Sequence, residues 1–226
     1  MIYFPFPNNK NIVLLREKLH SRPHCNRQEQ IWQRKKQTKQ LLQSLPELSQ
    51  ARIGHHSSGA PFLINHHSLN LSISHSKQEL VLLLSPREEI PGIDVEEINN
   101  RPEKIRHKFM TTRELGIYDQ LSLQDPQDAI LWCCMVWCSK EAAYKVFNPS
   151  DHSLKKNFEL SFPSYTQKSL KENLSTEFSL KLLSQQHPPL SPNLHCPEGK
   201  EVSIHFILSS STEKSLIALI LLHDEL

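Results

Sequence analysis

The alternation of apolar and polar residues along the chain predicts a set of short antiparallel strands. Period-two alternation or an unbroken apolar run marks the segments 69–74, 80–84, 93–96, 202–208 and 216–222. The polar residues 76–78 separate the first two segments and fit a hairpin turn, and a polar Ser/Thr/Glu/Lys stretch separates the last two. The pattern therefore predicts two antiparallel pairs, one in each half of the chain.

Long stretches free of Gly and Pro predict the helices. Residues 28–45 form a basic stretch of this kind. Residues 128–146 form a more apolar stretch whose hydrophobic side chains cover much of a helical circumference, so we expect it to be buried, with Pro149 ending it. Between them, the sequence from Thr111 to Glu114 fits a capping box, in which Thr111 is the N-cap and Glu114 reaches back to it.

Each half of the chain thus offers a helix and an antiparallel pair of strands. This faint repeat predicts an α+β fold made of two similar halves in a pseudo-twofold arrangement, each a small antiparallel sheet packed on helices. We place the boundary after Pro91 and Gly92, which gives an N-terminal half at 1–92 with the basic helix and a C-terminal half at 93–226. The Ser- and Pro-rich segment 150–200 predicts no clear element.

Composition then excludes several kinds of nucleotide site. The chain has 226 residues, of which 38% are hydrophobic, enough for a core, and its formal net charge is +2. It contains only 5 Gly, well below the average usage of about 7%. None of them forms a G-x-G-x-x-G turn or a complete P-loop, so classical dinucleotide and Walker-type sites are excluded. Any phosphate must be held by side chains and metal.

The sequence also indicates a compartment. Residues 1–15 lack the cationic start, long apolar core and cleavage site of a signal peptide. The longest apolar run, 216–222, is far shorter than the roughly 20 residues of a membrane helix. The odd number of cysteines shows no framework spacing, and Cys134 and Cys138 belong to no C-x-x-C pair, so we expect reduced, buried thiols and no zinc site. We therefore expect a cytoplasmic protein that is not attached to a membrane.

Candidate chemistry begins with two acids on one predicted strand. Asp94 and Glu96 are two residues apart, so their side chains point to the same side, with Cα atoms about 6.5–7 Å apart. Gly92, just before them, would allow a ligand or a neighbouring backbone to approach closely. Two oxygen donors in this arrangement suit Mg²⁺. An ordinary exposed strand face would also show such acids.

A second candidate lies on the long apolar helix. Glu141 and Lys145 are one turn apart and share a face, and Trp137 lies one turn before Glu141. An intrahelical ion pair would explain them, but charges that include Lys140 are costly on a mostly buried helix unless they have partners. A metal ion together with a phosphorylated ligand would supply those partners.

The third candidate is the pair Ser74 and His75, where a predicted strand enters its turn. Hydroxyl and imidazole groups at this place could bind a phosphate, although a polar hairpin turn explains them equally well.

Taken together and in order, these motifs resemble the 4′-phosphopantetheinyl transferase superfamily, in particular its monomeric, two-half, surfactin-synthetase-activating type. The resemblance rests on Ser-Ile-Ser-His-Ser at 72–76, Gly-Ile-Asp-Val-Glu at 92–96, Phe-Met-Thr-Thr-Arg-Glu at 109–114 and Trp-Cys-Ser-Lys-Glu-Ala-Ala-Tyr-Lys at 137–145. It spans about residues 54–147. It implies a pseudo-twofold pair of α+β halves with coenzyme A in the crevice between them.

The resemblance also implies roles for individual residues. Asp94, Glu96 and Glu141 match the carboxylates that bind Mg²⁺. Lys145 matches the lysine that contacts the phosphates of coenzyme A, and Lys140 is its neighbour in the motif. The serine that is modified needs a base, for which Glu141 or a metal-bound water are the two candidates.

Further ligand contacts are implied, with one departure from the family pattern. Ser74 and His75 match the pair that holds the phosphate end of coenzyme A. Ala60 stands where the family often has Lys, so one cationic phosphate contact is missing. The residues that could compensate are Arg22, Arg27, Arg34 and Lys35.

The implied activity is transfer of phosphopantetheine from coenzyme A to a serine of an apo acyl or peptidyl carrier protein, with release of adenosine 3′,5′-bisphosphate. Two alternatives remain open. One is a degenerate homologue that binds coenzyme A or carrier protein without turnover. The other is a nucleic-acid-binding protein that uses the basic stretch 16–39, which the small net charge and few nearby aromatics disfavour.

Overall fold

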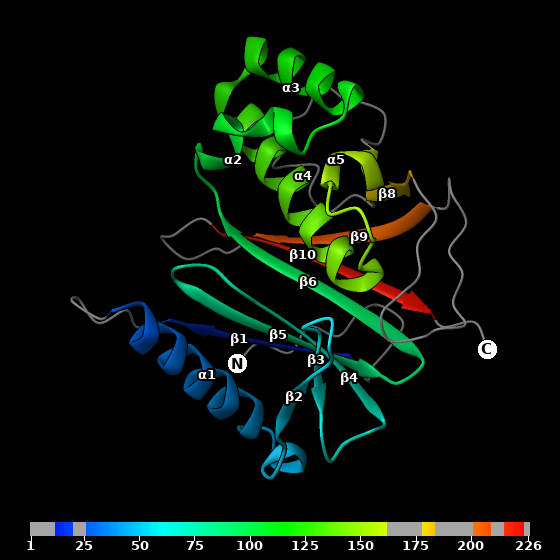
Figure 1. Ribbon diagram of the computed structural model, residues 1–226. Helices are drawn as coiled ribbons and strands as arrows, with labels where there is room; N and C mark the ends of the chain where they lie inside the picture. The colour runs from blue at the N-terminus through cyan, green and yellow to red at the C-terminus, as the bar shows by residue number, and fades with distance from the viewer. Residues whose placement is uncertain (1–11, 20–25, 162–177, 184–200, 209–214, 224–226) are drawn as a thin grey trace.

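Two larger antiparallel sheets, a separate two-stranded hairpin and the helices that cover the sheets make up the fold seen in the computed structural model (Figure 1). The structure describes residues 12–19, 26–161, 178–183, 201–208 and 215–223. The strands are β1 Val13–Lys18, β2 Ile53–His55, β3 Pro61–Leu63, β4 Leu69–His75, β5 Glu79–Pro86, β6 Glu89–Glu97, β7 Phe158–Ser161, β8 Phe178–Leu182, β9 Glu201–Leu208 and β10 Ser215–His223. The α-helices are α1 Arg27–Gln43, α2 Arg101–Lys104, α3 Thr112–Gln124, α4 Pro126–Phe147 and α5 Leu154–Asn157, with 3₁₀ turns η1 Pro46–Leu48 and η2 Arg106–Lys108.

The first sheet has the order β1-β5-β4, and α1 packs on one of its faces. The α1 helix begins with a capping box in which Asn26 accepts from the Glu29 amide and Glu29 accepts from the Asn26 amide. Alternate residues of β5, such as Leu80 and Leu82, join Leu42 in the core beneath α1. The hairpin of β2 and β3 lies beside this sheet.

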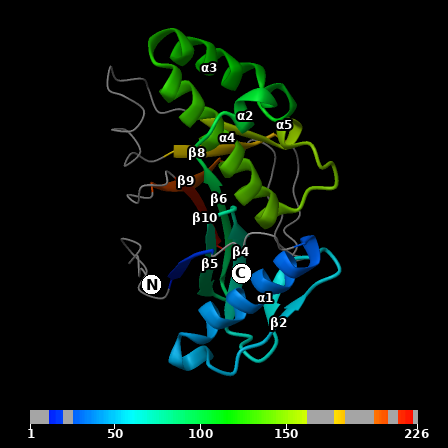
Figure 2. The same ribbon diagram turned by 90° about the vertical axis from the view of Figure 1, so that its left-hand side faces the viewer.

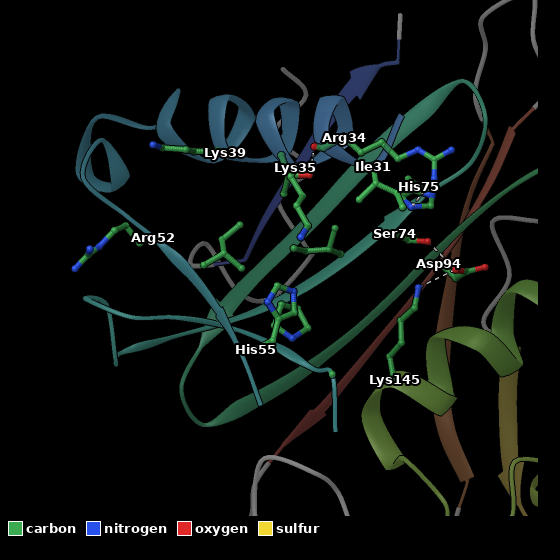
Figure 3. A pocket seen from close by; sticks show the side chains of 15 residues that line it. Ile31, Arg34, Lys35, Lys39, Arg52, His55, Ser74, His75, Asp94 and Lys145 are labelled. Carbon is green, nitrogen blue, oxygen red and sulfur yellow. Dashed lines mark hydrogen bonds and ion pairs between the residues drawn. The ribbon is translucent and has the colours of Figure 1, made fainter. Parts of the chain in front are cut away.

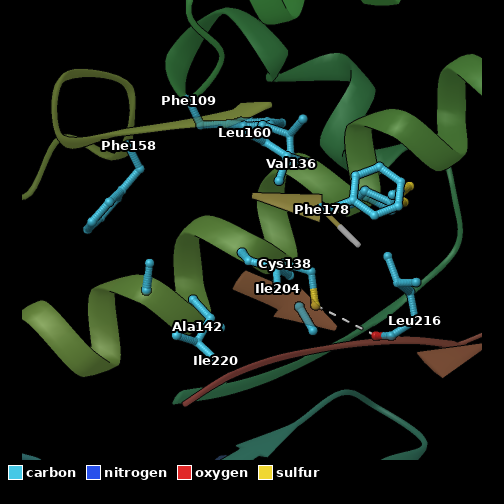
Figure 4. Packing of buried hydrophobic residues seen from close by; sticks show 14 of the residues in the cluster. Phe109, Val136, Cys138, Ala142, Phe158, Leu160, Phe178, Ile204, Leu216 and Ile220 are labelled. Atoms are coloured by element: carbon cyan, nitrogen blue, oxygen red, sulfur yellow. Dashed lines mark hydrogen bonds between the residues drawn. The ribbon is translucent and has the colours of Figure 1, made fainter. Parts of the chain in front are cut away.

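The second sheet has the order β6-β10-β9-β8-β7, and α4 crosses it. Apolar residues of β9 and β10, among them Ile204 and Leu216, pack against Val136 and Ala142 of α4 (Figure 4). The thiol of Cys138 donates to the Leu216 carbonyl at 3.6 Å. This explains why the helical stretch is apolar nearly all round.

The two sheets also pack on each other. Val81 and Leu83 on the second face of β5 form one core with Ile93 and Val95 of β6 and Ile217 of β10. The packing order therefore runs from α1 through the first and second sheets to α4, and Figure 2 shows α4 in the upper part of the molecule and α1 in the lower part. β5 is apolar from Leu80 to Leu84 because both of its faces are covered there.

Gly92 sets the distance between β6 and α4. A Cβ atom at this position would lie 2.4 Å from the Ala142 carbonyl oxygen and 2.5 Å from Val146 Cγ2. The close approach expected at Gly92 is therefore confirmed, and the partner is helical backbone. This contact brings the side chains of α4 down onto the acids of β6.

The predicted α+β class, the five predicted strands and the capping box at Thr111 are confirmed. β6 begins at Glu89, so the boundary proposed after Gly92 falls inside a strand. Within the described parts of 150–200, the structure adds α5, β7 and β8, which the sequence did not predict. No helix among the described residues has both the length and the apolar character that a membrane span requires.

Candidate active site

A pocket of about 870 Å³ runs along the free edge of β4, from α1 to the C-terminal half of α4 (Figure 3). Among the residues that the structure describes, its walls carry five cationic side chains, those of Arg34, Lys35, Lys39, Arg52 and Lys145, and a single carboxylate, that of Asp94. His55 and His75 also face it. Because cations outnumber acids so strongly, the pocket suits a ligand with several negative charges.

Asp94 is the meeting point of three elements. Its Oδ1 atom accepts hydrogen bonds from Ser74 Oγ of β4 at 2.7 Å and from Lys145 Nζ of α4 at 2.8 Å. Lys145 Nζ also donates to the Ile93 carbonyl at 2.8 Å. The side chain of Asp94 is 8% exposed, and its Oδ2 atom is buried without a hydrogen-bond partner among the described residues. The Oδ1 atom thus accepts two hydrogen bonds, and the Oδ2 atom is left for a further ligand.

Glu96 lies on the same side of β6 as Asp94 and faces α4. Its Oε1 atom accepts from Trp137 Nε1 at 3.0 Å. Burial raises the pKa of Glu96 to about 7, and the nearby charge of Asp94 adds to the rise. A bound cation would stabilise the ionised form of this buried carboxyl.

Glu141 joins this acidic group from α4. Burial raises its pKa, and the charge of Asp94 adds to this, while Lys145 opposes it. Glu141 also lines a second pocket of about 320 Å³, together with the aromatic side chains of Phe109, Trp137 and Tyr144. It therefore stands between the group of acids and that aromatic pocket.

The donor set fits a divalent cation, although its side chains are not gathered around one point. Among the described residues, no three His, Cys, Asp or Glu side chains are grouped closely enough to hold one ion as they are oriented. Lys145 instead neutralises Asp94, and Trp137 holds Glu96. The unpartnered Oδ2 of Asp94 and the raised pKa values of both glutamates nevertheless show a crowded negative region of hard oxygen donors, the kind that Mg²⁺ prefers.

A comparison with protein families matches this region. Residues 91–201 match the family model of the 4′-phosphopantetheinyl transferase superfamily. These residues form a domain of this superfamily. A comparison with curated proteins found no match. The matched segment contains Asp94, Glu96, Glu141 and Lys145, so the superfamily predicted from the motifs is confirmed, and phosphopantetheine transfer is its general activity.

The structure corrects the expectation that Lys140 has a phosphorylated ligand as its partner. Its side chain is 0% exposed, and its Nζ atom donates to Glu114 Oε2 at 2.7 Å and to the Phe109 carbonyl at 2.8 Å. Burial lowers the pKa of Lys140, and the Glu114 carboxylate opposes that shift. Because its ammonium is committed inside the core, Lys140 makes no contact with the pocket.

The basic residues proposed as replacements for the missing lysine divide into three kinds. Arg34 and Lys35 line the pocket, and Arg34 Nη1 lies 3.4 Å from His75 Nε2. Burial lowers the pKa of His75, and the charges of Arg34 and Lys145 act in the same direction. Arg27 is exposed on α1 and does not line the pocket, and Arg22 lies outside the described residues.

Sequence reasoning missed three basic residues of the pocket: Lys39, Arg52 and His55. Lys39 follows Lys35 by one helical turn, and this spacing could have placed both on one face. Arg52 and His55 come from the segment around β2, whose position beside α1 follows from tertiary packing. No local pattern indicates them.

The buried cysteines are structural. Cys133, Cys134 and Cys138 are all free and buried on α4, as expected. Burial raises the pKa of Cys133 to about 12 and that of Cys134 to about 11. These thiols are therefore protonated at neutral pH and weakly reactive.

Proposed function

We propose that this protein transfers the 4′-phosphopantetheine group of coenzyme A to a serine hydroxyl of an acyl or peptidyl carrier protein, in a reaction that depends on Mg²⁺. One observation carries the proposal: a strongly cationic pocket ends at the buried Asp94 of β6 and at Lys145 of α4, within the segment that matches the superfamily. Coenzyme A has a diphosphate and a 3′-phosphate, so its charge complements the pocket. The volume of about 870 Å³ lies in the usual range for ligand sites.

The distribution of the basic residues favours a compact anionic ligand over nucleic acid. Arg34, Lys35 and Lys39 face a concave pocket. Arg16, at the start of the basic stretch, is paired with Glu79 across the first sheet. A nucleic-acid backbone would instead require an extended exposed track of cations.

The reaction forms a bond between the serine Oγ and the phosphorus nearest the pantetheine. It breaks the bond from that phosphorus to the bridging oxygen, and adenosine 3′,5′-bisphosphate leaves with the electron pair. The serine proton passes to a base. Such a transfer depends mostly on positioning and on neutralising charge.

Each residue would have a part in this transfer. Lys145 supplies a fixed positive charge beside the diphosphate, and Arg34 and Lys35 orient the anionic ligand along α1. Asp94, Glu96 and Glu141 would hold Mg²⁺, which when bound offsets charge on the diphosphate. Glu141, which borders the second pocket, would also accept the serine proton.

The test is a mass measurement on a panel of apo carrier proteins incubated with the purified protein, coenzyme A and Mg²⁺. Addition of one phosphopantetheine mass is expected, and Asp94→Asn and Glu141→Gln should each abolish it. Glu88→Gln, an exposed acid on the turn before β6, is the matched control and should keep the wild-type rate. Binding of coenzyme A with no transfer to any carrier would show instead a homologue that binds without turnover.

A further inference from the structure

We infer that Ser74 is a positioning residue, which orients the Asp94 carboxylate for a divalent cation. This inference rests on the proposed function, because the cation is the one that the transfer would use. It assigns to Ser74 a role beyond the phosphate contact implied by the family resemblance.

The first observation is the direction of the Ser74 hydroxyl. Ser74 is 8% exposed, and its Oγ donates to Asp94 Oδ1 at 2.7 Å in a buried hydrogen bond. A hydroxyl has one proton to donate, so while this bond exists it has none for a phosphate oxygen. Figure 3 shows the Ser74 side chain directed at Asp94.

The second observation is the asymmetry of the carboxylate. Oδ1 receives both Ser74 and Lys145, whereas Oδ2 is buried with no partner among the described residues. A buried polar atom without a partner is costly, so Oδ2 needs a further ligand. Fixing Oδ1 from the β4 side therefore determines where Oδ2 points.

The third observation separates the two donors of Oδ1. The side chain of Lys145 is 30% exposed and lines the cationic pocket, so an anionic ligand competes with Asp94 for its ammonium. Ser74 lines the same pocket, but it carries no charge and is nearly buried, so an anionic ligand attracts its hydroxyl less strongly than the ammonium of Lys145. It is the donor that continues to hold Asp94 when Lys145 turns to a phosphate.

The hydrogen bond also crosses between the two sheets. β4 and β6 lie side by side but belong to different sheets, and Ser72 and Ser74 of β4 bridge to β6 with their side chains. Ser72 Oγ accepts from the Ile93 amide at 3.2 Å and touches no carboxylate in the described structure. Ser72 is therefore a matched control: the same residue type, the same strand, similar burial, but no contact with the site.

The experiment compares Ser74→Ala, Ser74→Thr and Ser72→Ala in the full-length protein. Mn²⁺ affinity is measured by electron paramagnetic resonance, without carrier protein. The transfer assay then gives the Mg²⁺ concentration for half-maximal transfer and the KM for coenzyme A. Residues that orient metal ligands typically change metal affinity by about 10–100-fold when removed. We expect Ser74→Ala to weaken Mn²⁺ binding about 10-fold, Ser74→Thr to restore most of it, and Ser72→Ala to leave it within about 2-fold.

Each result decides between specific ideas. Unchanged Mn²⁺ affinity in Ser74→Ala, or a loss confined to the KM for coenzyme A, would overturn the inference while leaving the proposed function intact. A wild-type protein that transfers nothing to any carrier would remove the proposed function, but Mn²⁺ affinity would still test the link from Ser74 to Asp94. If Ser74→Ala does not fold, Ser74→Cys, which keeps a weak donor of similar size, should bind Mn²⁺ with intermediate affinity.

Discussion

Two lysines of one helix show how differently the same kind of ion pair is used. Lys140 and Glu114 are both 0% exposed, at a distance of 2.7 Å, and both oxygens of Glu114 are occupied, since Oε1 accepts from the Leu160 amide at 2.7 Å. Lys145 and Asp94 are 2.8 Å apart, but their side chains are 30% and 8% exposed and one oxygen of Asp94 has no described partner.

The difference teaches what distinguishes a structural pair from a functional one. The Lys140 pair is complete in that both oxygens of Glu114 accept hydrogen bonds, and it joins α4 to the N-terminus of α3, and through Leu160 to β7. The Lys145 pair is incomplete and opens on a cationic pocket. Polar groups that are buried and satisfied stabilise the fold, whereas an unsatisfied group at a pocket indicates a missing ligand.

The largest expected effect comes from breaking the complete pair. Lys140→Met leaves the Glu114 carboxylate buried without its cation, so the free energy of unfolding should fall by about 3–5 kcal/mol. Urea unfolding followed by circular dichroism measures this. Adding Glu114→Gln to the same chain should recover part of the loss, because the isolated charge is then gone. A loss below about 1 kcal/mol in the single variant would contradict a buried, committed pair.

Breaking the incomplete pair should separate activity from stability. Lys145→Met is expected to lower kcat/KM for carrier modification by about 100–1,000-fold, since a fixed charge beside the reacting phosphates is lost. The free energy of unfolding should fall by only about 1–2 kcal/mol, because Lys145 is partly exposed and Ser74 still bonds Asp94. Equal losses of stability in Lys140→Met and Lys145→Met would remove the distinction between the pairs.

A third substitution acts on the spacing between β6 and α4. Gly92→Ala places a methyl group against the Ala142 carbonyl oxygen and should cost about 1–3 kcal/mol of unfolding free energy. Because it moves α4 away from Asp94, transfer activity should fall as well. Gly116→Ala, on α3 with open space at its Cβ position, is the control and should stabilise by about 0.5–1 kcal/mol.

The smallest effect is a pH dependence caused by Glu96. Burial raises its pKa from 4.5 to about 7, so between these values the folded protein binds a proton that the unfolded chain has released. In the absence of metal, the melting temperature should therefore decline as pH rises from about 4.5 to 7 and then level off. Glu96→Gln should flatten this decline. Mg²⁺ should raise the melting temperature of the wild type more at pH 8 than at pH 5, and an equal rise at both would argue against cation binding by these acids.

Local patterns in the chain determined a large share of the architecture. Alternation, an unbroken apolar run and the Thr111–Glu114 cap predicted the main strands and helices because each depends on neighbours within a few residues. The motifs around Asp94 and Glu141 also predicted the superfamily, since spacing on one strand and one helix is a sequence property. In the same way, the close approach at Gly92 followed from the absence of a side chain.

Only tertiary structure decided which polar groups meet. Lys140 and Lys145 belong to the same sequence motif, but Lys140 pairs with Glu114 of α3 and Lys145 pairs with Asp94 of β6. Arg52 and His55 enter the pocket through the packing of the segment around β2 against α1, and Ser74 turns to Asp94 because two separate sheets lie edge to edge there. Hydrogen bonds and ion pairs act over about 3 Å in space, whatever the separation in sequence, so their partners follow from the packed fold.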